Sequence, residues 1–199
     1  MTGLREKKKA QTRKRLADAA LSLFCERGFD NVTVAEVASS VDAAVSTLFS
    51  YFPSKESLVF DEDDSYEQAL VTVVRERDQN ASILDALEGF FLAVPHRGSD
   101  ETAAAFVGLV NSTPALLDYA SRMQRRWEAS LAAALADAAG LPQGDILATV
   151  LARYVLDADF VVTYGSEPRS TLRTIFARLR EGWSDFGTPA EASAIRVAT

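Results

Sequence analysis

The chain has 199 residues, a net charge of −7 and 48% hydrophobic residues. These values are ordinary for a soluble globular protein, so the chain can bury a core without disulfides or metal. Its single cysteine, Cys25, cannot form an internal disulfide. No apolar run reaches the roughly 18 residues of a membrane span, and no apolar signal segment follows the basic N-terminus. We therefore expect a cytoplasmic protein with no membrane partner.

The first predicted element is a basic helix. Residues 5–15 carry seven basic side chains against Glu6, a net charge of +6. Residues 1–60 carry +2 and the rest of the chain −9. Apolar residues recur every three or four positions over 7–26, and Gly28 provides the left-handed residue that ends a helix there. This asymmetry predicts that one end of the chain contacts a polyanion, although charge alone fits a solvated, disordered arm equally well.

Two short helices follow. Thr33 and Glu36 have the spacing of a capping box, which predicts a helix from Thr33 to about Ser40. After a short turn, a third helix is expected over 45–52, because Pro53 disfavours the α conformation of the residue before it. Two short helices joined by a tight turn are typical of a helix-turn-helix, whose second helix lies in the major groove of DNA.

The remaining segments are longer, and no alternating strand pattern interrupts them, so the fold is predicted to be all-α. Further helices are expected over 65–77, 83–94, 101–111, 114–139, 144–164 and 170–186. This pattern predicts a head over 1–60, a helical body over 61–187 and a flexible tail over 188–199.

The head carries motifs with specific spacing: Phe24-x-x-x-Gly28-Phe29, then Thr33-Val34-x-x-Val37-Ala38, then Thr47-Leu48-Phe49-x-Tyr51-Phe52-Pro53-Ser54-Lys55-Glu56. Over residues 9–60 the sequence resembles the TetR family of bacterial transcriptional regulators. The resemblance implies a three-helix DNA-binding head followed by a helical body for ligand binding and dimerisation. It supplies no ligand, because family members diverge beyond the head.

The resemblance also implies which residues contact DNA. Thr33, at a helix N-terminus, would meet a phosphate, and Tyr51 and Lys55 would bind the backbone. Phe49 would lie against thymine methyl groups or sugar, with a place in the core as an equal alternative. Leu48 is assigned to the core, as is Phe52. With Lys14 of the basic segment, the predicted DNA-binding residues are Lys14, Thr33, Val45, Ser46, Thr47, Phe49, Tyr51 and Lys55.

The reading helix departs from the usual family pattern. The turn glycine is Asp42, and the usual serine cap is Ala44, which removes a side-chain acceptor. Val45 and Ala35 stand where many relatives carry long polar side chains. We therefore expect readout through methyl and hydroxyl groups and DNA shape, with much of the affinity supplied by the basic segment and a steep dependence on salt.

The body is expected to enclose a mostly apolar ligand site. Asp157 lies in an otherwise apolar helix, where a pairing arginine, a ligand or a solvent-facing edge would accommodate it. Every other candidate fits a plain core equally well. The predicted ligand-binding residues are Phe90, Phe106, Asn111, Tyr119, Met123, Trp127, Asp157 and Phe160. The apolar faces over 144–164 and 170–186 fit either a monomer core or, as the resemblance implies, the interface of a two-fold homodimer.

No catalytic or metal-binding set is found, and no cofactor is expected, since the chain has one histidine and no glycine-rich phosphate loop. The sequence therefore predicts a repressor that leaves a double-stranded, palindromic operator when a small-molecule effector binds. Two alternatives stay open. One is an enzyme that uses the helical cavity. The other is a helical ligand-binding or interaction protein whose head has lost specific DNA binding.

Overall fold

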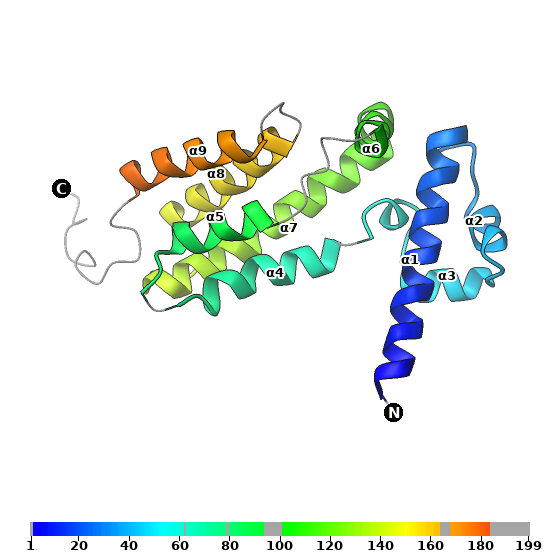
Figure 1. The fold of residues 1–199 in the computed structure, drawn as a ribbon, viewed down its shortest axis with the longest axis horizontal. Helices are drawn as coiled ribbons and strands as arrows, with labels where there is room; N and C mark the ends of the chain where they lie inside the picture. The colour runs from blue at the N-terminus through cyan, green and yellow to red at the C-terminus, as the bar shows by residue number, and fades with distance from the viewer. Residues whose placement is uncertain (1, 62, 79, 94–100, 164–167, 184–199) are drawn as a thin grey trace. The chain divides into compact units, whose positions relative to one another are not determined.

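The computed structural model describes residues 2–61, 63–78, 80–93, 101–163 and 168–183. Within these ranges the chain forms α-helices, one short 3-10 helix and no strand, so the predicted all-α class is confirmed (Figure 1). The elements are α1 (Thr2–Arg27), α2 (Val34–Ser40), α3 (Val45–Tyr51), η1 (Glu56–Leu58), α4 (Asp63–Arg75), α5 (Ile83–Ala93), α6 (Glu101–Ser112), α7 (Pro114–Ala139), α8 (Ile146–Thr163) and α9 (Pro168–Gly182).

The main departure from the predicted boundaries lies at the N-terminus. Helix α1 begins at Thr2, five residues before the predicted start, so the basic segment is helical rather than a disordered arm. Residues 4–10 are strong helix formers without glycine or proline, which explains the extension. The predicted tail over 188–199 lies outside the described residues.

The chain divides into two compact units. The first comprises Met1–Asp64 and Asp100–Ser121, so the helix-turn-helix shares a unit with α6 and the beginning of α7. Its core contains Phe24 and Phe52, both fully buried, together with Leu109 of α6 and Leu116 of α7. Five apolar residues of the helix-turn-helix are buried or half-buried here: Val34, Val37, Ala38, Val41 and Leu48.

The second unit comprises Ser65–Ser99 and Arg122–Thr199. Within it, α9 packs against α5 and α8 in a helical bundle (Figure 1). Leu172 and Phe176 of α9 are fully buried in this unit, as is Val155 of α8. Part of each apolar face predicted over 144–164 and 170–186 is therefore core of a single chain.

The start of α3 lacks a side-chain cap. Its N-cap is Ala44, in the extended conformation with φ −74° and ψ 147°, and no side chain accepts a hydrogen bond there. The preceding turn contains Asp42 at φ 55°, the one described residue other than glycine with a positive φ. Asp42 therefore adopts the left-handed conformation that glycine takes more readily.

We expect Ala44→Ser to stabilise the head by about 1 kcal/mol, because the backbone at Ala44 already has N-cap geometry and a serine hydroxyl would accept from the Thr47 N–H. Urea unfolding of the full chain measures the effect. Ala129→Ser, at an exposed site within α7, is the matched control and should cost a few tenths of a kcal/mol. Equal effects of the two substitutions would contradict a missing cap.

Candidate DNA-binding site

The outer face of α3 presents short, uncharged side chains. Val45 is 37% exposed and Phe49 48% exposed, and Ser46 lies beside them at the surface. Thr47 is half-buried, whereas Leu48 is fully buried. The core position of Leu48 is confirmed, and the same holds for Phe52, while Phe49 belongs to the surface. Such a face offers methyl, hydroxyl and aromatic groups but no charged hydrogen-bond donor.

The N-terminus of α2 is closed by the predicted capping box, which is confirmed. The Thr33 N–H donates to Glu36 Oε2 at 2.8 Å, and the Glu36 N–H donates to Thr33 Oγ1 at 3.2 Å. The Thr33 hydroxyl also donates to the carboxylate, and Arg27 pairs with it at 2.7 Å. The Thr33 hydroxyl, which is a candidate phosphate contact, therefore already donates to the neighbouring Glu36 carboxylate.

Part of the basic segment of α1 faces solvent. Lys7, Lys8 and Lys9 are exposed. Lys14 lies 2.9 Å from Asp18 one turn later, with both side chains more than half exposed. An exposed pair of this kind contributes roughly 0–1 kcal/mol, so the Lys14 ammonium can exchange its carboxylate for a phosphate at little cost.

Two arginines of the same segment turn toward backbone carbonyls, and sequence reasoning missed their role. Arg13 is half-buried; its Nη1 donates to the Tyr51 carbonyl at 2.7 Å and its Nη2 to the Asp61 carbonyl. Its guanidinium carbon lies 4.5 Å from the centre of the Phe52 ring. Arg15 donates to the Val41 carbonyl at 3.2 Å. No local pattern announces these bonds, because the acceptors lie 26 to 48 residues further along the chain.

The candidate phosphate ligand Lys55 is also engaged within the head. Its half-buried ammonium donates to the Phe29 carbonyl and lies 4.2 Å from the centre of the Phe29 ring. The Phe24 ring follows at 5.4 Å. Tyr51 is half-buried, and its carbonyl accepts from Arg13. An ammonium has three donors, so Lys55 keeps N–H groups for a second acceptor.

Comparison with known proteins decides what this head belongs to. Residues 16–61 match the family model described as bacterial regulatory proteins, tetR family. The chain is 30% identical over 151 residues to the HTH-type transcriptional regulator TcmR of Streptomyces glaucescens, covering 72% of this chain and 67% of that protein. The chain belongs to the TetR family. It is a DNA-binding transcriptional regulator, and the family is not one of enzymes.

Two further similarities cover different lengths of the chain. Over 49 residues it is 45% identical to the HTH-type transcriptional repressor KstR of Rhodococcus jostii strain RHA1, covering 25% of this chain and 23% of that protein. The solved structure of Salmonella enterica GusR matches with a TM-score of 0.57 at 24% identity, covering 88% of this chain and 95% of that chain. The first match concerns a short segment, whereas the second shows that the fold is shared along most of the chain.

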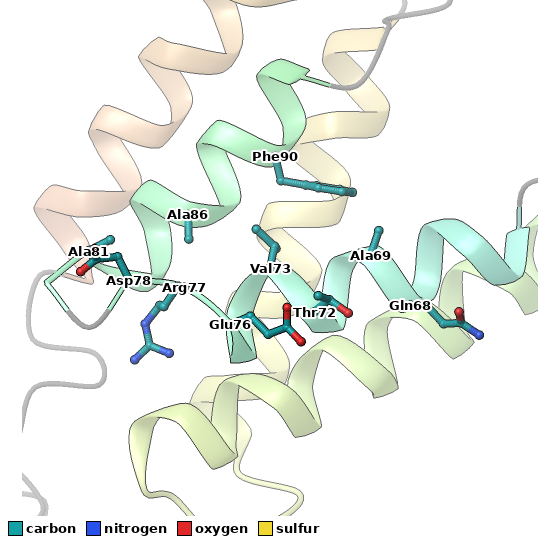
Figure 2. Close-up of a pocket in the computed structure, with 10 residues that line it drawn as sticks. All are labelled: Gln68, Ala69, Thr72, Val73, Glu76, Arg77, Asp78, Ala81, Ala86 and Phe90. Carbon is teal, nitrogen blue, oxygen red and sulfur yellow. The ribbon is translucent and has the colours of Figure 1, made fainter.

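The second unit of this TetR-family regulator carries an open groove of about 550 Å³ between α4 and α5. Val73 and Ala69 of α4 line it together with Phe90 and Ala86 of α5 (Figure 2). Polar side chains, among them Glu76, also line it. The volume lies within the range of about 300–1,000 Å³ that small-molecule sites occupy.

The candidate ligand residues are divided between the two units. Phe90 lines the groove, and Phe106, Asn111 and Tyr119 belong to the first unit. In that unit Phe106 and Tyr119 pack on Phe60, with ring centres 5.9 and 5.3 Å apart. Asp157 has a polar partner, since its carboxylate accepts from Gln124 at 3.1 Å. The Phe160 side chain lies outside the described residues.

Two candidates of the second unit, Met123 and Trp127, are half-buried. Tyr66 of α4 joins Trp127 to the groove, because its ring centre lies 4.5 Å from that of Trp127 and 5.6 Å from that of Phe90. Sequence reasoning missed Tyr66. The available signal was an aromatic residue in the predicted helix 65–77, which precedes other predicted helices that carry aromatic residues. Phe90, Tyr66 and Trp127 thus form one aromatic row.

Two negative findings concern only the part of the chain that the structure describes. Among those residues, no three histidine, cysteine, aspartate or glutamate side chains come together as metal ligands would. No helix in the same ranges combines the length and apolar composition that crossing a membrane requires.

The capping box of this regulator titrates in acid. The Thr33 N–H, and then Arg27 and the Thr33 hydroxyl, hold the pKa of Glu36 at about 2, below its ordinary 4.5. A lowered pKa in the folded state means that the stabilisation is complete above about pH 4.5 and is lost as the pH falls toward 2.

We therefore expect Glu36→Gln to destabilise the chain at pH 6 and to cost progressively less between pH 4.5 and 2, measured as the difference in urea midpoint from wild type. Glu6→Gln, at an exposed position of α1, is the control and should show no such trend. A Glu36→Gln deficit that stays constant over this range would rule out the capping carboxylate as its source.

Proposed function

We propose that the chain is a repressor that binds a palindromic operator as a homodimer and leaves it when a small, mostly apolar ligand binds the second unit. The observation that carries the proposal is the exposed, uncharged face of α3 in the same unit as the exposed lysines of α1. Uncharged groups suit base edges, and ammonium groups suit phosphates, so the two surfaces divide readout and affinity between them. The repressor KstR, similar over 49 residues, supports this direction of regulation.

In this proposal the first residues of α3 approach the base edges. Val45 and Phe49 offer apolar contacts to thymine methyl groups, and Ser46 and Thr47 offer hydroxyl groups. The residues that we propose to contact DNA phosphates precede and follow α3 in the chain or lie at its end. They are Lys14, Thr33, Tyr51 and Lys55. Thr33 and Lys55 contribute through groups that also serve the fold, so the exposed lysines of α1 supply most of the electrostatic attraction.

The proposed dimer uses the apolar surface that α8 leaves exposed. Ile146 is 69% exposed, Leu147 38% and Tyr154 51%, and all three are on one helix. Covering such side chains by a second copy removes apolar area from water. A two-fold axis would also set two reading helices about 34–36 Å apart, one turn of DNA.

Release of the operator requires that the ligand prefer one conformation. A ligand with equal affinity for the DNA-binding and the released state would shift nothing, whereas a 10⁴-fold preference moves a 1:99 equilibrium to about 99:1. We propose the groove between α4 and α5 as the ligand site, since apolar side chains line it together with polar ones, which suits a mostly apolar molecule with some polar groups.

The DNA proposal is tested by selecting bound duplexes from a random pool and measuring affinity for the selected palindrome between about 50 and 200 mM salt. Each phosphate contact adds roughly 0.9 to the slope of log affinity against log salt. We expect a steep slope that the triple variant Lys7→Ala, Lys8→Ala, Lys9→Ala lowers by about 2 to 3.

The control is Arg173→Ala, an exposed arginine of α9, which should leave both affinity and slope unchanged. A wild-type slope near zero would exclude phosphate binding by the basic segment of α1. Failure to retain any palindrome at low salt would instead favour a helical ligand-binding or interaction protein whose head has lost specific DNA binding.

The groove is tested with 1-anilinonaphthalene-8-sulfonate, an apolar fluorescent probe. We expect Ala86→Trp, whose indole fills the groove, to abolish most of the fluorescence that the wild-type chain induces, because Ala86 lines this groove. Ala93→Trp, at an exposed site of α5 away from the groove, is the control and should bind the probe normally. Normal probe binding by Ala86→Trp would exclude this groove.

A further inference from the structure

Helix α3 has little to hold it in place by itself. It has seven residues, no side-chain bond at its N-cap and one buried side chain, Leu48. An isolated helix shorter than about 12–15 residues is marginal in water, and its last carbonyl groups have no partner within the helix. Its orientation must therefore be imposed by the groups that pack against it.

Arg13 provides such a contact at the C-terminal end of α3. The Tyr51 carbonyl, which belongs to the last residue of the helix, accepts from Nη1 at 2.7 Å. A cation at this end also interacts favourably with the helix dipole. The same guanidinium lies over the Phe52 ring at 4.5 Å and donates from Nη2 to Asp61, just before α4. One side chain thus joins α1, the end of α3 and the segment that leads into α4.

Arg15, two residues later on α1, reaches the other side of the helix-turn-helix. It donates to the Val41 carbonyl at 3.2 Å, and Val41 is the C-cap of α2 at the start of the turn into α3. The two arginines therefore hold the backbone at both ends of the turn and reading helix. Arg13 makes two bonds and a ring contact, whereas Arg15 makes one bond at an exposed site.

We infer that Arg13 is a positioning residue for the reading helix. Its guanidinium binds the Tyr51 and Asp61 carbonyls and the Phe52 ring instead of a DNA phosphate. The inference rests on the proposed function insofar as α3 reads the operator. A planar guanidinium can donate to two carbonyls in its own plane while its flat face covers a ring, whereas an ammonium has no flat face to lay against the ring. The basic segment is therefore divided, with Arg13 serving orientation and the exposed lysines serving attraction.

The experiment compares Arg13→Met with Lys14→Met in the full chain. Hydrogen exchange of the free protein is read over peptides covering 45–52 and 34–40. We expect Arg13→Met to speed exchange in 45–52 at least ten-fold while 34–40 changes less than three-fold, and Lys14→Met to alter neither. This readout needs no DNA, so it stands even if the proposed function fails.

The second measurement is affinity for the selected palindrome and for a poly(dI-dC) duplex across salt. A positioning role predicts that Arg13→Met weakens palindrome binding at least ten-fold, leaves poly(dI-dC) binding within two-fold and leaves the salt slope unchanged. A phosphate contact predicts equal weakening on both duplexes and a slope lower by about 0.9, as expected for Lys14→Met.

Arg13→Lys keeps the cation near the Phe52 ring and one carbonyl bond, so it serves if Arg13→Met does not fold. It should lose about half of the palindrome preference on a logarithmic scale. Wild-type exchange in 45–52 for the folded Arg13 variants overturns the inference, as does the pattern of a phosphate contact. Absence of binding to any duplex by the wild-type chain, with fast exchange in Arg13→Met, overturns the proposed function alone.

Discussion

Every short helix leaves backbone N–H and C=O groups without partners at its ends, and the head must satisfy them. The helices α2 and α3 have seven residues each, so these end groups make up most of their backbone. At the start of α2 the backbone N–H groups of Thr33 and Glu36 are bonded by each other's side chains. The carbonyls of Val41 and Tyr51 are met from α1, by Arg15 and Arg13. The long helix thus supplies the donors that hold the short ones.

This requirement changes the meaning of the basic charge in the head. A net charge of +6 over residues 5–15 suggests a uniform surface for a polyanion. In the structure, Arg13 and Arg15 donate to carbonyls of the same unit, and Lys55 does likewise with Phe29. The exposed side chains of this basic segment include Lys7, Lys8, Lys9 and Lys14, and Arg15 is exposed beside its carbonyl bond. Arginine suits the first task because its planar group binds several acceptors, and lysine suits the second as a solvated point charge.

The sequence predicts an interaction when the residues that make it are close together along the chain. The capping box joins residues three apart, and Pro53 acts on its neighbour, so both were readable locally. Arg13 instead bonds carbonyls 38 and 48 residues away, which no periodicity announces. Apolar spacing likewise indicated which faces of the later helices are buried. It did not reveal that Phe106 and Tyr119 belong to the unit of the head, because apolar periodicity names a face and not its neighbour.

The short side chains of α3 make its orientation matter more than it would for a charged reading helix. Dispersion contacts of the kind that Val45 and Phe49 offer lose a quarter to a half of their strength over a gap of about 0.5–1 Å. A long arginine adapts to such a displacement by changing rotamer, whereas a valine cannot. At the same time, Ala44 provides no cap, and Asp42 takes a conformation that favours glycine. A reading surface of this kind can discriminate between sequences only if other parts of the head hold the backbone of α3 within a fraction of an ångström, and the bonds from α1 are placed at its end and at the turn before it.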